Sequence, residues 1–178
     1  MNNRGWVQGD GGPLIVLQTS AAAHWQGAKE FDNSIMNGGS IETDYDVICE
    51  CVEEVCLMRR YDRDMLVLSD SEWQGRMFAS PSGQITVVQS LYQDEEFPDI
   101  TEWADQSEPS RSFSFAVEDA ALRLIVGAGD GEGSTYGRVD TPITPGAKRC
   151  DVYTFNDGIV VTIGTHGEES IRDNLTTE

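Results

Sequence analysis

The clearest fold signal lies in residues 75–92, which read GRMFASPSGQITVVQSLY. The stretch begins and ends with runs of strand-forming composition, 75–79 and 84–92. Between them, Pro81 fixes one backbone angle and Gly83 permits a left-handed one, which is the chemistry of a tight turn. The stretch therefore predicts a β-hairpin.

Runs of similar composition recur along the chain, separated by residues that favour turns. The further predicted strands are residues 13–18, 47–52, 55–61, 65–69, 112–117, 122–128, 136–139, 149–155 and 159–164. Strand runs spaced by roughly 8–12 residues are typical of antiparallel sandwiches and barrels. The sequence thus predicts a mainly β fold, or α+β with few short helices. We expect antiparallel sheets in a sandwich-like or partly closed barrel-like arrangement.

Helices are expected at two places at most. A short helix is predicted after the first strand, capped by Thr19 or Ser20. A helix over residues 47–60, capped at Asp44 or Asp46, is the alternative to two strands there. The alternation and the β-branched content favour the strands.

The length of 178 residues fits a single domain spanning residues 1–178. The alternative organisation is two β subdomains, 1–93 and 111–167, joined by an acidic connection over residues 94–110. This connection contains two prolines, which suit neither the interior of a helix nor that of a central strand.

The charge balance is strongly acidic. Asp and Glu number 31 against 12 Lys and Arg, for a formal net charge of −19, and the sequence pI is about 4.2. No Lys or Arg occurs between Arg76 and Arg111. Such a charge repels nucleic acid and anionic membranes and attracts cations and basic proteins over long range. The alternative is that the acids only keep the protein soluble.

The sequence predicts a cytoplasmic protein. No apolar run approaches 18 residues, so no membrane span is expected. Residues 1–12 are polar and Gly-rich and lack the apolar core of a secretory signal, so none is expected. The four cysteines are Cys49, Cys51, Cys56 and Cys150. Because cytoplasmic thiols stay reduced, we expect buried thiols, with a zinc site and a disulfide as the alternatives.

Catalytic signatures are weak. The two histidines, His24 and His166, lie in no recognisable catalytic motif. The Gly-rich loop 127–133 lacks the residues of a phosphate-binding loop, and a calcium site through Asp130 and Glu132 is the better reading of it. Calcium would need a fuller set of ligands than this loop offers.

A second short pattern, Asp44-Tyr45-Asp46, matches the D-x-D motif that holds a metal–nucleotide, but three residues are too few to be specific. We therefore expect no catalytic residue, no metal ligand, no cofactor and no enzymatic activity. A carboxylate- or metal-dependent hydrolase is the enzymatic alternative, because so many acids always provide pairs. A non-catalytic ligand-binding β domain is the third.

The order of short motifs resembles the Immunity protein 21 family, bacterial immunity proteins encoded beside polymorphic toxins. The motifs are Trp6, Gly11-Gly12-Pro13-Leu14-Ile15, Trp25 with Gly27, Asp44-Tyr45-Asp46 leading to Cys49, Leu66-Val67-Leu68 ending at Asp70, residues 120–127, and Thr144-Pro145-Gly146 leading to Asp151-Val152-Tyr153. The resemblance implies a non-catalytic inhibitor that binds one cognate toxin domain. From the net charge, we expect neither nucleic acid nor a membrane as a partner.

A partner of this kind gives the acidic stretch a role. Toxin domains that attack nucleic acid are usually basic, and opposite charges speed encounter. The expected contact residues are Asp94, Glu95, Glu96, Asp99, Glu102, Trp103 and Asp105. Trp103 is the expected aromatic anchor. The other tryptophans, Trp6, Trp25 and Trp73, are interpreted as interface anchors or as half-buried core residues.

Overall fold

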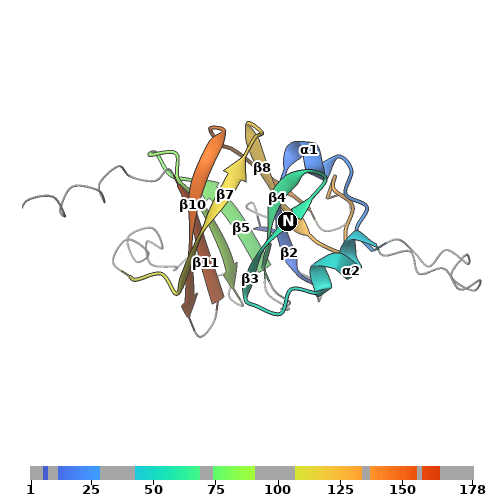
Figure 1. Ribbon diagram of the computed structural model, residues 1–178, viewed down its shortest axis with the longest axis horizontal. Helices are drawn as coiled ribbons and strands as arrows, with labels where there is room; N and C mark the ends of the chain where they lie inside the picture. Colours follow the sequence, from blue (N-terminus) through green and yellow to red (C-terminus); the bar gives the residue numbers. More distant parts are fainter. Residues whose placement is uncertain are drawn as a thin grey trace, which may run out of the picture.

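Two antiparallel sheets packed face to face make up the protein (Figure 1). The computed structural model describes residues 6–7, 12–28, 43–68, 74–90, 107–133, 137–155 and 158–164. Within them, one sheet has six strands in the order β1-β5-β6-β11-β10-β7, and the other has five in the order β3-β4-β2-β8-β9. The prediction of a mainly β, sandwich-like fold is confirmed, and the two sheets do not close into a barrel.

The strands of the six-stranded sheet are β1 (Trp6–Val7), β5 (Gln74–Ala79), β6 (Ile85–Ser90), β7 (Arg111–Val117), β10 (Gly146–Phe155) and β11 (Gly158–Gly164). Those of the five-stranded sheet are β2 (Leu14–Gln18), β3 (Val55–Arg60), β4 (Arg63–Leu68), β8 (Ala121–Val126) and β9 (Val139–Pro142). The helices are α1 (Thr19–Ala22) and α2 (Asp44–Cys49). Each sheet combines strands from before residue 93 with strands from after residue 111, so the sheets do not divide at the acidic connection.

The predicted hairpin is confirmed by β5 and β6 up to Ser90, and residues 91–92 lie outside the described residues. Gly83 adopts a φ of 82° in its turn, and the Ser80 amide donates to the Gln84 carbonyl at 2.8 Å. The β3–β4 hairpin turns instead on Tyr61 and Asp62, which have φ values of 52° and 58°. Bulky residues rarely adopt this left-handed conformation, so tertiary contacts must hold Tyr61 there.

The five-stranded sheet is buried on both faces. One face packs on the six-stranded sheet through Leu14, Val16 and Leu66, among other side chains. The other face is covered by the helices, which lie on the outer side of this sheet (Figure 1), and it contributes Ile15 and Leu17. Burial on both faces explains why residues 14–17 of β2, 65–68 of β4 and 124–126 of β8 are continuous apolar runs instead of alternating ones.

Gln18, at the end of β2, ties the two sheets together. Its side chain is fully buried, and its Nε2 donates to the carbonyls of Ala116 at 2.9 Å and Asp64 at 3.2 Å. Its Oε1 accepts from the amides of Glu118 at 2.6 Å and Asp119 at 3.1 Å. One amide side chain therefore satisfies four backbone groups at the place where β7 ends.

The prediction of a strand over residues 47–52 is wrong, because α2 forms there. Thr43 and Asp46 make a reciprocal capping box: the Asp46 amide donates to Thr43 Oγ1 at 3.1 Å, and the Thr43 amide donates to the Asp46 carboxylate at 2.9 Å. The hydrogen bonds that the Asp46 carboxylate accepts from the Thr43 amide and the Thr43 hydroxyl lower the pKa of Asp46. Ile48 is buried against the outer face of the five-stranded sheet. Capping and packing outweigh the strand preference of the β-branched residues.

Two smaller predictions also need correction. Helix α1 is not capped by Thr19 or Ser20, which lie inside it. The carboxylate of Asp119 accepts from the Ser20 amide and from both hydroxyls, so the cap comes from another part of the chain. Strand β9 spans Val139–Pro142, where it pairs with β8, so among the described residues the strand predicted at 136–139 overlaps it only at Val139. As an edge strand it tolerates its proline.

Candidate interaction surface

The predicted contact residues lie outside the described residues, but the end of the acidic stretch lies within them. All seven of these positions, Asp94, Glu95, Glu96, Asp99, Glu102, Trp103 and Asp105, are in the range 91–106 that the structure leaves undescribed. The described end reaches the six-stranded sheet at Ser110, whose amide and hydroxyl both donate to the Val152 carbonyl, at 2.8 and 2.9 Å. Glu108, just before it, is exposed.

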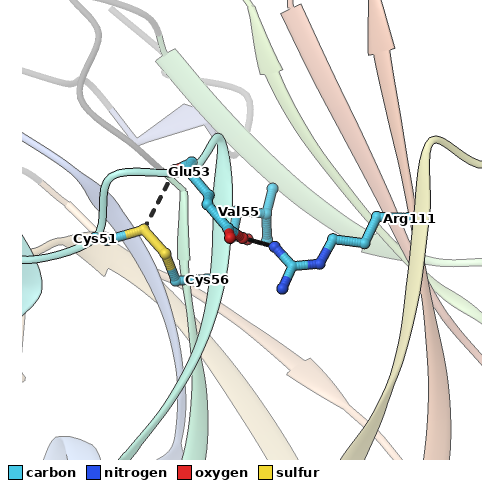
Figure 2. Close-up of a disulfide and its surroundings, with 5 residues drawn as sticks. All are labelled: Cys51, Glu53, Val55, Cys56 and Arg111. Atoms are coloured by element: carbon cyan, nitrogen blue, oxygen red, sulfur yellow. Dashed lines mark hydrogen bonds and ion pairs between the residues drawn. A yellow bond between two sulfur atoms is a disulfide. The ribbon is translucent and has the colours of Figure 1, made fainter.

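A second acidic segment reaches the same end of the molecule. The loop between α2 and β3 sends Glu53 into an ion pair with Arg111, the first residue of β7 (Figure 2). Arg111 also donates to the Val55 carbonyl at 3.3 Å, and the Thr154 hydroxyl donates to the Glu54 carboxylate at 2.6 Å. The α2–β3 loop of one sheet thus contacts the start of β7 and the end of β10 in the other.

The sequence contained a signal for this convergence that the predictions missed. No Lys or Arg occurs between Lys29 and Arg59, so a second stretch without bases precedes the one after Arg76. The later part of this second stretch carries Glu50, which is exposed. Arg111, a base at this junction, is already paired with Glu53.

The same loop contains a disulfide, which corrects the expectation of buried thiols. Cys51 and Cys56 are bonded, with 6.0 Å between their Cα atoms (Figure 2). Cys49 is an exposed free thiol, and Cys150 is a buried one, as expected. Burial raises the pKa of the Cys150 thiol far above its usual value, so this thiol stays protonated. The disulfide forms because α2 ends close to the start of β3, whereas the sequence predicts two strands, at residues 47–52 and 55–61, in this region.

The arginines are largely matched inside the protein. Within the described residues, each arginine except Arg76 forms an ion pair: Arg59–Asp64, Arg60–Asp44, Arg63–Glu118, Arg111–Glu53, Arg123–Asp140, Arg138–Glu132 and Arg149–Asp151. Arg76 lies over the ring of Phe78, 5.6 Å from its centroid. The charge of these seven arginines is therefore compensated locally, and the acids in excess set the sign of the field around the protein.

The D-x-D pattern serves the fold. The Asp44 side chain is only 4% exposed and accepts from the Gln26 amide at 2.8 Å, from Arg60 Nε at 3.0 Å and from the Tyr61 hydroxyl at 2.8 Å. The carboxylate of Asp46 is used in the capping box. Both carboxylates are thus taken up by hydrogen bonds within the chain.

These contacts also shift pKa values around Asp44. The hydrogen bond to Asp44 raises the pKa of Arg60, whose guanidinium lies 5.4 Å from the Tyr61 ring centroid. Burial, followed by the hydrogen bond to Asp44, raises the pKa of Tyr61. The hydrogen bond from the Tyr61 hydroxyl to Asp44 is one of the tertiary contacts of the left-handed turn. His24 is exposed and stacks near this tyrosine, with 5.6 Å between ring centroids. His166 lies outside the described residues.

The Gly-rich loop 127–133 is likewise a packing element. The Gly131 amide donates to the Trp25 carbonyl, and Arg123 donates to the Gly131 carbonyl at 2.8 Å. Glu132, considered as a calcium ligand, pairs with Arg138 at 2.6 Å. Among the described residues, no group of three or more His, Cys, Asp or Glu side chains is arranged to hold a metal ion.

The tryptophans divide between core and undescribed segments. Trp25 is buried among the side chains between the helices and the five-stranded sheet, and its Nε1 donates to the Gly127 carbonyl at 3.0 Å. Trp6 is half-buried in β1. Trp73 and Trp103 lie outside the described residues. In the part of the chain that the structure describes, no helix is long and apolar enough to cross a membrane.

The fold and this surface define a small, acidic, two-sheet β protein. The family model for Immunity protein 21 matches residues 5–110, and the chain belongs to that family. It is an immunity protein of a toxin system, and its family is generally non-catalytic. The match confirms the family suggested by the sequence motifs, although the motifs of residues 120–153 lie beyond it. No curated protein and no solved structure matches the chain.

Proposed function

We propose that this immunity protein binds and neutralises one cognate bacterial toxin domain by protein–protein contact, and that the toxin domain is basic. The observation that carries the proposal is the combination of family membership with internally matched arginines. An unmatched acidic surface attracts a basic partner and speeds encounter. A toxin domain that acts on nucleic acid fits, since such a domain must hold phosphates.

The contact is assigned to the acidic stretch, with Asp94, Glu95, Glu96, Asp99, Glu102 and Asp105 as its charged residues and Trp103 as its anchor. Support comes from the described end of the stretch, where Ser110 is fixed to β10 and Glu54 lies close by on Thr154. The stretch therefore joins the sandwich at a defined place that is itself acidic.

The proposal includes the organisation and location of the protein. Hydrogen bonding between strands of both halves in each sheet supports one domain spanning residues 1–178. A protein that protects the producing cell from a toxin acting on cytoplasmic targets belongs in the cytoplasm. No nucleic acid or membrane is expected to bind a surface of this charge.

The test is co-purification with the toxin domain encoded immediately upstream, followed by a protection assay in cells that express it. The wild-type protein is expected to co-purify with the toxin and restore growth. Trp103→Ala is expected to raise the dissociation rate about 30-fold, which corresponds to roughly 2 kcal/mol for an anchor residue. Trp25→Phe, which alters the core and not this stretch, is the control for folding. Failure of the wild-type protein to bind the toxin would reject the proposal.

A further inference from the structure

Three of the four cysteines fall within eight residues at the junction of the two sheets. Cys49 lies in the last turn of α2, Cys51 follows it, and Cys56 is the second residue of β3. Cys49 is exposed, whereas Cys51 and Cys56 are half-buried and bonded to each other. A small reductant can therefore approach this bond, in contrast to the fully buried thiol of Cys150.

The bond closes the loop that contacts the other sheet. Between the two cysteines, Glu53 pairs with Arg111 (Figure 2). Glu54 accepts a hydrogen bond from the Thr154 hydroxyl. Val52, beside them, is 94% exposed and contributes nothing to the core. The loop is therefore held by the disulfide between its two ends and by the polar contacts of Glu53 and Glu54 with the six-stranded sheet.

Exposed polar contacts of this kind are weak on their own. Arg111 and Glu53 are each about half exposed, so solvent screens their attraction. Such contacts persist when the loop that carries them has few alternative conformations. A disulfide that closes a short loop restricts its conformations in this way. When the disulfide is opened, the loop gains conformational entropy, and the two polar contacts alone must offset it to keep the loop in place.

We propose that the Cys51–Cys56 disulfide is a reversible redox clasp that fixes the α2–β3 loop against the six-stranded sheet. A dithiol reductant opens it in two steps. A thiolate of the reductant attacks one sulfur, forms a mixed disulfide and releases the other cysteine as a thiolate, which takes up a proton. The second thiolate of the reductant then resolves the mixed disulfide, so the reductant is oxidised by two electrons and both cysteines become thiols.

The structure accommodates both states. Cys51 Sγ lies 3.3 Å from the Glu53 carbonyl oxygen, which provides an acceptor for the thiol once it is reduced. An oxidised dithiol, which is itself a disulfide, closes the bond again by the reverse of these two steps and is reduced by two electrons. Cys49 is a third, exposed thiol two residues from Cys51. The link to toxin binding rests on the proposed function, since the loop contacts Arg111 beside the anchored end of the acidic stretch.

The experiment compares the full chain before and after treatment with dithiothreitol, without denaturant. Alkylation of the native protein is expected to modify Cys49 alone before treatment, and Cys49, Cys51 and Cys56 after it. Amide hydrogen exchange of residues 51–56 and 110–113 is expected to accelerate about tenfold on reduction, while the core of β2 is unchanged.

Matched variants separate the bond from its contacts. The double variant Cys51→Ser with Cys56→Ser is expected to show the amide hydrogen exchange of the reduced protein both with and without dithiothreitol. Cys49→Ser is expected to keep the difference between the two states. Glu53→Gln breaks the ion pair with Arg111 and is expected to accelerate exchange at residues 110–113 without changing the number of alkylated thiols.

Two results would overturn the clasp: a bond that dithiothreitol reduces only after denaturation, or unchanged exchange at these residues after reduction. Toxin binding is measured separately on both redox forms. If both forms bind equally, the clasp has no role in docking, whereas loss of binding by both forms would reject the proposed function and leave the redox result intact.

Discussion

The buried amide of Gln18 offers the sharpest test of how the two sheets are joined. Gln18→Leu keeps the side-chain size but removes hydrogen bonds to the Asp64 and Ala116 carbonyls and from the Glu118 and Asp119 amides. A net value of about 1 kcal/mol per bond gives roughly 4 kcal/mol. Leucine regains about 1 kcal/mol by burying apolar surface, so we expect the free energy of unfolding to fall by about 3 kcal/mol.

The assay is equilibrium urea unfolding followed by fluorescence and circular dichroism. With a slope of about 2 kcal/mol per molar urea, the midpoint is expected to fall by about 1.5 M with an unchanged slope. Gln26→Leu is the matched control, because its side chain is exposed, and it is expected to change stability by no more than about 0.5 kcal/mol. If Gln18→Leu lies within the range of that control, the tie between the sheets does not depend on this residue.

The Gln18→Glu variant is expected to make the free energy of unfolding depend on pH. A carboxylate at this site would face two carbonyl oxygens, so burial and repulsion raise its pKa in the folded state above the unfolded value of about 4.3. A raised folded pKa means that stability is retained below the unfolded pKa and lost as pH rises through the folded one. The variant is therefore expected to approach wild-type stability near pH 4 and to be weakest at neutral pH.

Three further predictions concern other contacts. Gly131→Ala is expected to cost about 3 kcal/mol in urea unfolding, since its Cβ would lie 1.7 Å from the Ala22 carbonyl oxygen; a neutral result would contradict that packing. Arg123→Met is expected to cost about 2 kcal/mol by breaking the pair with Asp140, and thermal unfolding that matches wild type would argue against it. The Tyr61 pKa is raised above 10.0, so its stabilisation is complete below pH 10 and lost as pH rises through the folded pKa. In an absorbance titration of the Tyr61→Phe variant, the ionisation at the highest pH that is assigned to Tyr61 is expected to be missing.

Local chemistry made part of the fold predictable. The hairpin of residues 75–92 carries its own turn residues, so its register follows from the sequence. The apolar runs in β2 and β8 predict strands by their composition and length, and burial on both faces of the sheet explains why these runs do not alternate. Helix α2 was missed although Thr43 and Asp46 have the spacing of a capping box, a signal that was readable.

The remaining features depend on contacts between residues far apart in the chain. Asp119 caps α1 across about a hundred residues, and Gln18 meets Ala116 over a similar separation. Prediction of the disulfide depends on the fact that α2 ends close to β3, and the two strands predicted for this region do not give that arrangement. The proposed contact stretch was chosen from charge, and charge does not fix where a segment lies.

The central claim is that a basic toxin domain docks on the acidic stretch, and association kinetics test it most directly. One variant reverses Asp94, Glu95 and Glu96 to Lys, and a second reverses Glu168, Glu169 and Asp173, so the net charge changes equally in both. The account predicts that the first variant lowers the association rate with the upstream toxin domain at least tenfold at low salt and flattens its salt dependence, while the second has a much smaller effect. Equal effects of the two variants, or none from the first, would contradict the claim.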